Sequence, residues 1–184
     1  PRAGTKILAS GGTHCNLTTT LGPGAAARLF GKQGDRFLRG PFQAFSPQAL
    51  REAFSDWGVP TRSAPLEKIF PVSGRARDVR DALLRVTLAA GVEVRYDTPL
   101  LDLIRPDGSG SPWTLRCSGD EALETRAVIL AAGGKSYPRT GTTGEGYGWL
   151  QRLGLPLVEP RPALVPLRSS AQWVQDLSGL SLQD

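Results

Sequence analysis

The stretch AVILAAGGKSYPRTGTTGEGYGWL, residues 127–150, decides the fold of this chain. Its first six residues form an apolar run with two β-branched members, which predicts a strand buried on both faces of a parallel sheet. Two glycine clusters follow, and apolar residues then recur at helical spacing until Gly154 and Pro156. The stretch therefore predicts a buried strand, a glycine-rich loop and a helix.

A loop of this kind has two interpretations. In an open α/β sheet, ligands bind at the carboxyl ends of the strands, where glycines let the backbone approach closely and a helix N-terminus favours an anion. Alternatively, the glycines only form tight turns beneath the helix. We favour the ligand site over the turn.

Residues 11–20, GGTHCNLTTT, form a second candidate ligand loop. A double glycine is followed there by a dense series of hydrogen-bonding side chains. A polar turn explains this composition structurally, and a loop folded over a polar ligand explains it functionally. We favour the second interpretation.

Composition bounds the class of protein. The chain has 184 residues, of which 40% are hydrophobic and 21% charged, as in an ordinary globular domain. No apolar run approaches the roughly 20 residues that span a bilayer, and no signal peptide is evident, so a cytoplasmic location without membrane contact is predicted. Because the chain lacks methionine and begins with Pro1, we interpret it as an internal piece of a longer protein.

The distribution of charge and the number of potential metal ligands argue against nucleic acid and metal ions as partners. The net charge is +5, but 18 arginines and 4 lysines are scattered without a run of like charge, which argues against nucleic-acid binding. The two cysteines, Cys15 and Cys117, match no zinc-binding spacing. His14 is the only histidine, which excludes a site with several histidine ligands, and no metal is predicted.

Periodicity and capping residues predict two helices. After Ser46-Pro47, apolar residues recur at i, i+3, i+4 and i+7 until Gly58. The second helix begins near Ser73 or Gly74, ends at Gly91 and keeps its apolar residues on one face. Both helices are predicted to pack against the core.

Short strands are predicted at residues 66–72, 92–96, 100–104 and 113–117. The last two belong to a small antiparallel β-meander that leads into the buried strand. Residues 21–45 show no long period, and we interpret them as a connection that Phe37, Phe42 and Phe45 anchor to the core.

Four segments resemble elements of one family. KILASGGTHCNLT (6–18) resembles the K-I-L-x-S-G-G-G-R-C-N-x-T element of the BaiN/YhiN-like flavoproteins, described as NAD(P)/FAD-dependent oxidoreductases. Residues 68–84, 131–155 and 160–167 resemble further elements of that family in the same order. Together these segments extend over nearly the whole chain, so the resemblance is more specific than a single glycine motif.

The resemblance implies an α/β fold, a Rossmann-like FAD-binding domain of the glutathione-reductase type with a small β-meander. Residues 1–159 would form this domain, and residues 160–184 would begin an inserted, mostly β second domain. The GxGxxG unit that binds the FAD pyrophosphate is absent from this sequence. We therefore expect the remainder of the polypeptide to be needed for a complete site.

The resemblance also implies which positions contact FAD. The positions on the flavin side are Gly11, Gly12, Cys15, Asn16 and Thr18, and the backbone of Leu100 would meet the adenine. The positions along the dinucleotide and near the isoalloxazine are Gly133, Gly134, Thr143, Gly144, Glu145 and Gly146. The sequence departs from the family's pattern at Thr13 and His14, which replace a glycine and an arginine, and at Glu145, which replaces an aspartate.

The chemistry implied is flavin-mediated hydride or electron transfer, with NAD(P)H as the expected donor and an unknown small molecule as substrate. No catalytic residue is identified from the sequence, and His14 is the single candidate proton donor because of its place in the flavin-side loop. Two alternatives stay open. One is a nucleotide-binding module without redox chemistry, and the other is an RNA-binding or RNA-modifying protein built on a flavin fold.

Overall fold

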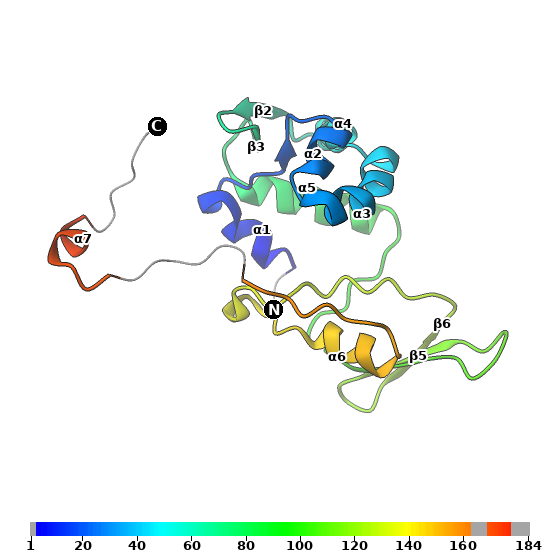
Figure 1. Ribbon diagram of the computed structural model, residues 1–184. Coiled ribbons are helices and arrows are strands. Elements are labelled where there is room, and N and C mark those ends of the chain that lie inside the picture. The colour runs from blue at the N-terminus through cyan, green and yellow to red at the C-terminus, as the bar shows by residue number, and fades with distance from the viewer. Residues whose placement is uncertain (1–2, 163–168, 178–184) are drawn as a thin grey trace.

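The computed structural model describes residues 3–162 and 169–177. Residues 3–91 form one lobe and residues 92–162 form a second, which lies below the first in Figure 1. Among the described residues, no helix is both long and apolar enough to cross a bilayer.

The first lobe is mainly helical. Its helices are α1 (Thr5–Ala9), α2 (Pro23–Arg28), α3 (Gly31–Ala44), α4 (Pro47–Asp56) and α5 (Ala76–Ala89), with a 3-10 turn at Ser10–Thr13. Its strands are β1 (Thr18–Thr19), β2 (Thr61–Ala64) and β3 (Lys68–Pro71), which form an antiparallel sheet in the order β1-β3-β2.

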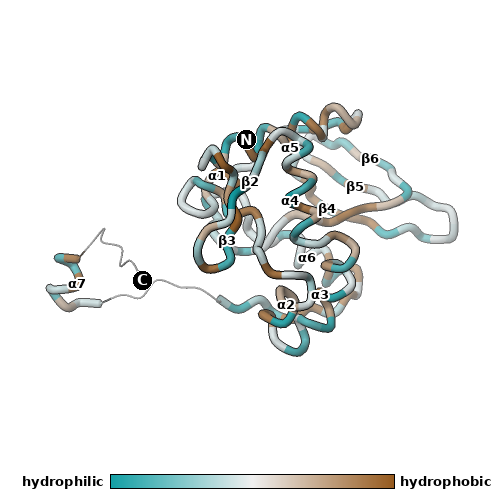
Figure 2. Tube along the Cα trace, turned by 90° about the horizontal axis from the view of Figure 1, so that it is seen from above, coloured by the Kyte–Doolittle hydropathy of each residue, from teal (hydrophilic) through white to brown (hydrophobic). Residues whose placement is uncertain are grey.

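The two predicted helices are confirmed as α4 and α5. The Ser46 hydroxyl accepts a hydrogen bond from the Ala49 N–H at 3.0 Å, which caps α4. Along both helices, hydrophobic residues recur every three or four positions, with hydrophilic residues between them (Figure 2). Each helix therefore has one apolar face to bury.

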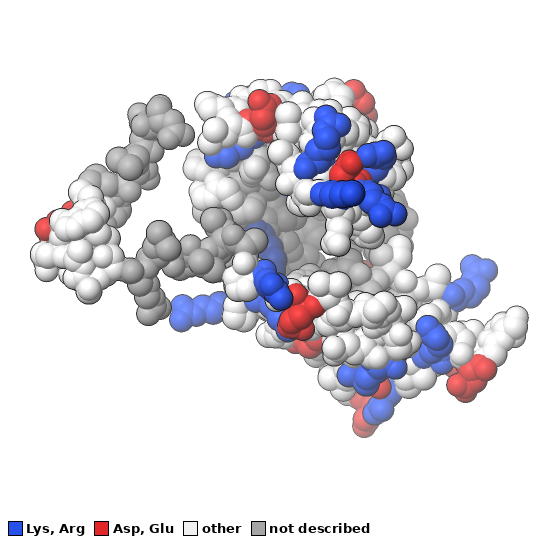
Figure 3. All heavy atoms as spheres, viewed as in Figure 1, with Lys and Arg blue, Asp and Glu red and all other residues white. Residues whose placement is uncertain are grey.

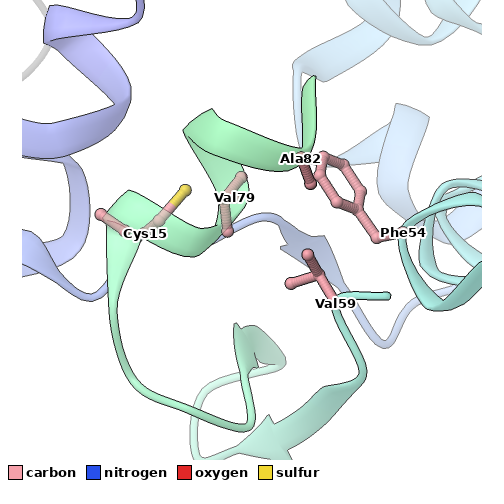
Figure 4. Close-up of a cluster of buried hydrophobic side chains, with 6 residues drawn as sticks. Cys15, Phe54, Val59, Val79 and Ala82 are labelled. Carbon is pink, nitrogen blue, oxygen red and sulfur yellow. The ribbon is translucent and has the colours of Figure 1, made fainter. Parts of the chain in front are cut away.

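These apolar faces form the core of the first lobe. Buried side chains of α4 and α5 meet Cys15 of the loop at residues 11–20 and Val59, which precedes β2, as Figure 4 shows. The buried members are Cys15, Phe54, Val59, Ala76, Val79 and Ala82. Because Cys15 is one of them, its side chain fixes the loop after Gly12 to the core.

The second lobe contains the predicted β-meander. Strands β4 (Leu100–Ile104), β5 (Trp113–Cys117) and β6 (Ala122–Thr125) pair antiparallel in the order β4-β5-β6. A 3-10 turn at Pro138–Thr140 precedes α6 (Glu145–Arg152), which is the helix expected after the glycine loop. Helix α7 (Gln172–Asp176) lies beyond this lobe in Figure 1.

Two predicted strands are not formed in this chain. The prediction of a buried strand at 127–132 is wrong here, because the segment belongs to no sheet and Ile129 is 94% exposed. The 92–96 segment likewise belongs to no strand. A strand needs at least one neighbouring strand to pair with, and a strand buried inside a parallel sheet needs two. Within the described residues neither segment pairs with a strand.

The interpretation of residues 21–45 as a simple connection is also wrong. They form α2 and α3, which pack on each other as a helical hairpin. Phe37 and Phe45 are 77% and 51% exposed, so neither anchors the segment in the core, whereas Phe42 is half-buried. Several glycines and Pro41 inside α3 conceal its helical pattern in the sequence.

The predicted domain boundary near residue 160 stays a prediction. Residues 163–168 and 178–184, which belong to the predicted second domain, lie outside the described residues.

Candidate functional site

Asn16 fixes the conformation of the loop at residues 11–20. Its side-chain Oδ1 accepts a hydrogen bond from the Ile69 N–H of β3 at 3.1 Å, and Ile69 itself is fully buried. Because the partner is a donor, the amide oxygen must face β3, and the amide nitrogen is left as a donor for another molecule. The side chain thus ties the loop to β3 and keeps one polar group available.

Gly11 closes the loop against Asn16. It has φ +55°, and a Cβ added there would lie 2.8 Å from the backbone nitrogen of Asn16 and 3.2 Å from the Phe70 ring. Only glycine meets both requirements, because a side chain would be strained by the dihedral angle and would overlap the backbone. The turn interpretation of this glycine therefore has a specific geometric basis, and the same turn sets the position of Asn16.

Cys15 and His14 lie on opposite sides of the same loop. Cys15 is 6% exposed and its side chain belongs to the core, so any contact that it makes with a cofactor falls to its backbone. His14 is exposed, its Nδ1 lies 3.3 Å from the Gly11 carbonyl, and its ring meets the edge of Phe70. The His14 ring is therefore accessible from outside the loop, whereas the Cys15 side chain is not.

The second set of predicted residues surrounds a loop that folds back on itself between 133 and 145. A Cβ at Gly133 would lie 3.0 Å from Cγ2 of Thr142, and one at Gly144, where φ is +90°, would lie 2.7 Å from Cγ of Lys135. The two arms of the loop are therefore closely packed. Gly144 also caps the start of α6, and Gly146 is buried within its first turn.

Glu145 lies in that first turn and is held by Thr143. The Thr143 hydroxyl donates to the Glu145 carboxylate. This hydrogen bond is the main reason that the pKa of Glu145 lies below its usual value, and backbone N–H groups at the start of α6 act in the same direction. The carboxylate is thus kept ionised at the entrance of the glycine loop.

The lowered pKa gives a testable pH dependence. A carboxylate with a lowered folded-state pKa contributes stability that is complete above its ordinary value of 4.5 and is lost as the pH falls through the lower folded value. Thr143→Val is expected to raise the pKa of Glu145 toward 4.5, measured by NMR titration of its side-chain carboxyl carbon. Thr140→Val is the control, because the Thr140 hydroxyl donates to the Tyr137 carbonyl instead. Equal titration curves for all three proteins would contradict this assignment.

Leu100 lies in the same lobe as the glycine loop. It begins β4 and pairs with Cys117 of β5. The next residue, Leu101, accepts a hydrogen bond from Nε1 of Trp149 in α6 at 3.3 Å, and Asp102 forms a 2.9 Å ion pair with Arg152. These contacts hold the start of β4 against α6, so the predicted adenine contact and the predicted Gly144 turn belong to one packed unit.

The predicted residues therefore fall into two groups, one in each lobe. A 2.6 Å hydrogen bond from Nζ of Lys6 to the Ser136 carbonyl connects the two, joining α1 to the loop that follows Gly134. Lys6 is not among the site residues predicted from the sequence. Its place at the start of the KILASGG element was the signal that could have identified it.

The donors present suit a flavin. Its ring carbonyls accept hydrogen bonds, and the exposed Asn16 retains an amide donor. Thr18, two residues later, is half-buried and carries a hydroxyl. Gly12 is exposed, and a Cβ there would meet only His14, so one side of the loop is open. Asn16, Thr18 and the backbone at Gly12 are the groups that would hold the ring.

Similarity to known proteins identifies the family of this chain. The HI0933-like protein Rossmann domain matches residues 1–176. The chain is 30% identical over 165 residues to a 3-dehydro-bile acid delta(4,6)-reductase of Clostridium scindens, which covers 90% of the chain and 38% of that protein. It is 24% and 25% identical to proteins named ribosomal RNA dihydrouridine synthase from Haemophilus influenzae and Escherichia coli, covering 98% of the chain and 45% and 43% of those proteins.

The chain thus spans less than half the length of these relatives. The family match extends over both lobes, including the flavin-side loop and the glycine loop. The predicted resemblance and the predicted Rossmann-like class are both confirmed. The chain belongs to the HI0933-like family of FAD-binding flavoproteins and carries its Rossmann-type domain.

Proposed function

We propose that the polypeptide containing this chain is a FAD-dependent oxidoreductase that takes a hydride from NAD(P)H and reduces a small molecule. The observation that carries this proposal is Asn16, whose amide is oriented by the buried Ile69 N–H and keeps a donor for the flavin. Membership of a flavoprotein family and the name of the Clostridium relative support it.

The residues of the chain bind and orient the cofactor. FAD, when bound, supplies the hydride chemistry. Asn16 and Thr18 would donate to the flavin ring, and Gly11 and Gly12 would let the backbone pass beneath it. The N-terminus of α6, at residues 144–146, is partly exposed. Its backbone N–H groups favour negative charge on a nearby ligand. His14 is the group proposed to give a proton to the reduced substrate.

We further propose that the site is completed by the rest of the polypeptide. Residues 1–159 would form part of the FAD-binding domain and residues 160–184 would begin a second domain. The protein would act in the cytoplasm. The segments at 92–96 and 127–132, which were predicted as strands and pair with no strand here, support a sheet that other strands complete.

The test uses the full polypeptide that contains this chain, purified without added cofactor. The expected result is a flavin absorbance spectrum that NADH or NADPH bleaches in the absence of oxygen. His14→Gln is expected to leave flavin content and bleaching unchanged while slowing reoxidation by the substrate. A purified, folded protein that neither carries nor takes up FAD would refute the proposal.

A second candidate substrate is RNA. Two relatives carry names that refer to ribosomal RNA, and both align over 98% of this chain. The observation that favours it here is a group of basic side chains over the α2–α3 hairpin, which Figure 3 shows around an acidic one. In this case the flavin would reduce a nucleobase, and the two candidates share the cofactor site.

A further inference from the structure

We propose that the exposed face of α3 that carries Lys32, Arg36 and Arg39 is a docking surface for single-stranded RNA. This inference rests on the second candidate substrate. It adds a surface on the α2–α3 hairpin, outside the positions predicted to bind FAD. The basic residues are scattered along the sequence, which argued against a nucleic-acid partner, but α3 gathers several of them on one face.

The helix brings the basic residues into one line. Lys32, Arg36, Arg39 and Gln43 follow one another at intervals of four, three and four residues within α3. At about 100° per residue, these four positions fall within an arc of about 60°. All four are exposed. The line is about 16 Å long, at about 1.5 Å per residue, which is enough to follow several phosphates of a strand.

Two of these cations are free to meet an anion. Arg39 forms an ion pair with Asp35 at 2.5 Å. Among the residues that the structure describes, neither Lys32 nor Arg36 has an ion-pair or hydrogen-bond partner. Arg28 at the end of α2 is exposed as well and adds a further positive charge to the hairpin. The face therefore has more positive charge than its one carboxylate offsets.

Exposed aromatic rings lie on another side of the helix. Phe30 is 63% exposed and lines the hollow that α3 shares with α4 and β3, and Phe37 is 77% exposed in the middle of the helix. At about 100° per residue, Phe37 lies about 130° around α3 from the middle of the basic line. The basic side chains, which can track a phosphate backbone, therefore carry the proposal without a stacking ring beside them.

The arrangement fits RNA better than an anionic membrane. A helix that lies on a membrane needs a continuous apolar face free to enter the lipid. In α3 the apolar Leu38 and Phe42 are half-buried, and Phe42 lines a hollow shared with α4 and β3. The free surface of the helix is consequently its basic side and Phe37.

The test measures binding of a fluorescein-labelled 20-mer of polyuridylate to the full polypeptide by fluorescence anisotropy over a range of salt concentrations. Lys32→Gln combined with Arg36→Gln is expected to weaken binding about tenfold or more at low salt and to reduce the slope of log affinity against log salt by about 1.4, because each phosphate contact contributes about 0.7 for a single strand. Phe37→Ala is expected to leave both the affinity and that slope unchanged, because Phe37 lies about 130° around α3 from the middle of the basic line.

Arg105→Gln combined with Arg126→Gln is the matched control, since it removes two exposed arginines of the second lobe. This variant is expected to bind RNA as the unchanged protein does. Equal losses in both double variants would mean that only net charge matters and would overturn the proposal, as would tighter binding to vesicles of phosphatidylserine than to RNA. Flavin content is read from the same samples. Bound flavin without RNA binding refutes this surface alone, whereas RNA binding without flavin refutes the oxidoreductase alone.

Discussion

Gly11→Ala is expected to abolish FAD binding by the full polypeptide and to lower its free energy of unfolding by about 2–4 kcal/mol. Gly11 has φ +55°, a left-handed conformation that costs a residue with a Cβ about 1–2 kcal/mol. The added Cβ would also lie 2.8 Å from the backbone nitrogen of Asn16, which has no flexible end to move aside.

The loss of FAD follows from the position of Asn16. Its Oδ1 bonds the Ile69 N–H at 3.1 Å, so a backbone displaced at Asn16 breaks this bond and leaves a buried donor unsatisfied. The amide that would hold the flavin then loses its orientation. The same displacement would press on Phe70, 3.2 Å from the added carbon.

Two further variants distinguish the cost of the positive φ at Gly11 from the cost of the steric overlap. Gly22→Ala introduces a Cβ into open space at a residue with φ −67°, and no change in flavin content or stability is expected. Gly12→Ala has a comparable φ of +62° but would meet only His14 at 3.8 Å, so it tests the dihedral cost without the overlap. The measurements are the ratio of flavin to protein and urea denaturation. A Gly11→Ala protein that retains one FAD per chain would show that this loop is not part of the site.

The sequence predicted those parts of the fold whose structure depends on local signals. Helix α4 has a hydroxyl cap at Ser46, proline at its first position and a glycine at its end, and α5 has an apolar face that fills the core. Strands β4 and β5 were predicted at their observed bounds. In each case, the residues that determine the element lie within it or next to it.

The failures occur where the decisive partner lies elsewhere. Helix α3 was missed because glycines and Pro41 lower its intrinsic helix propensity and none of its residues is buried. The 127–132 segment was predicted as a strand because of its apolar composition, but composition alone cannot provide the neighbouring strands that a parallel sheet requires. Both errors concern long-range packing.

The candidate site shows the same division. The two glycine-containing loops could be identified from the sequence, and their resemblance to one family is confirmed. The hydrogen bond from Lys6 to Ser136 that connects the lobes could not be identified from the sequence, because it joins residues 130 positions apart. The orientation of the Asn16 amide also required the structure, since it depends on the position of β3.

The substitution Ile129→Lys is expected to change the free energy of unfolding little in the isolated chain and strongly in the longer polypeptide that contains it. In the isolated chain Ile129 is 94% exposed, and an exposed substitution changes the free energy of unfolding by less than about 0.5 kcal/mol. In a polypeptide of the relatives' length, we propose that 127–132 becomes a central strand. There the same substitution would remove a buried aliphatic side chain and place an unpaired charge in a sheet, at a cost of about 3–5 kcal/mol.

The comparison requires urea denaturation of both proteins, with and without the substitution. Val158→Lys is the control, because Val158 is 92% exposed and lies outside every predicted strand, and its effect is expected to be small in both proteins. Equally small effects of Ile129→Lys in both would contradict the proposed strand. A large effect only in the longer polypeptide would mean that the apolar run is stabilised by strands from outside this chain. Because Gly133 and Gly134 directly follow this run, the same added strands would then also fix the glycine loop, and FAD affinity would fall together with stability in the longer Ile129→Lys protein.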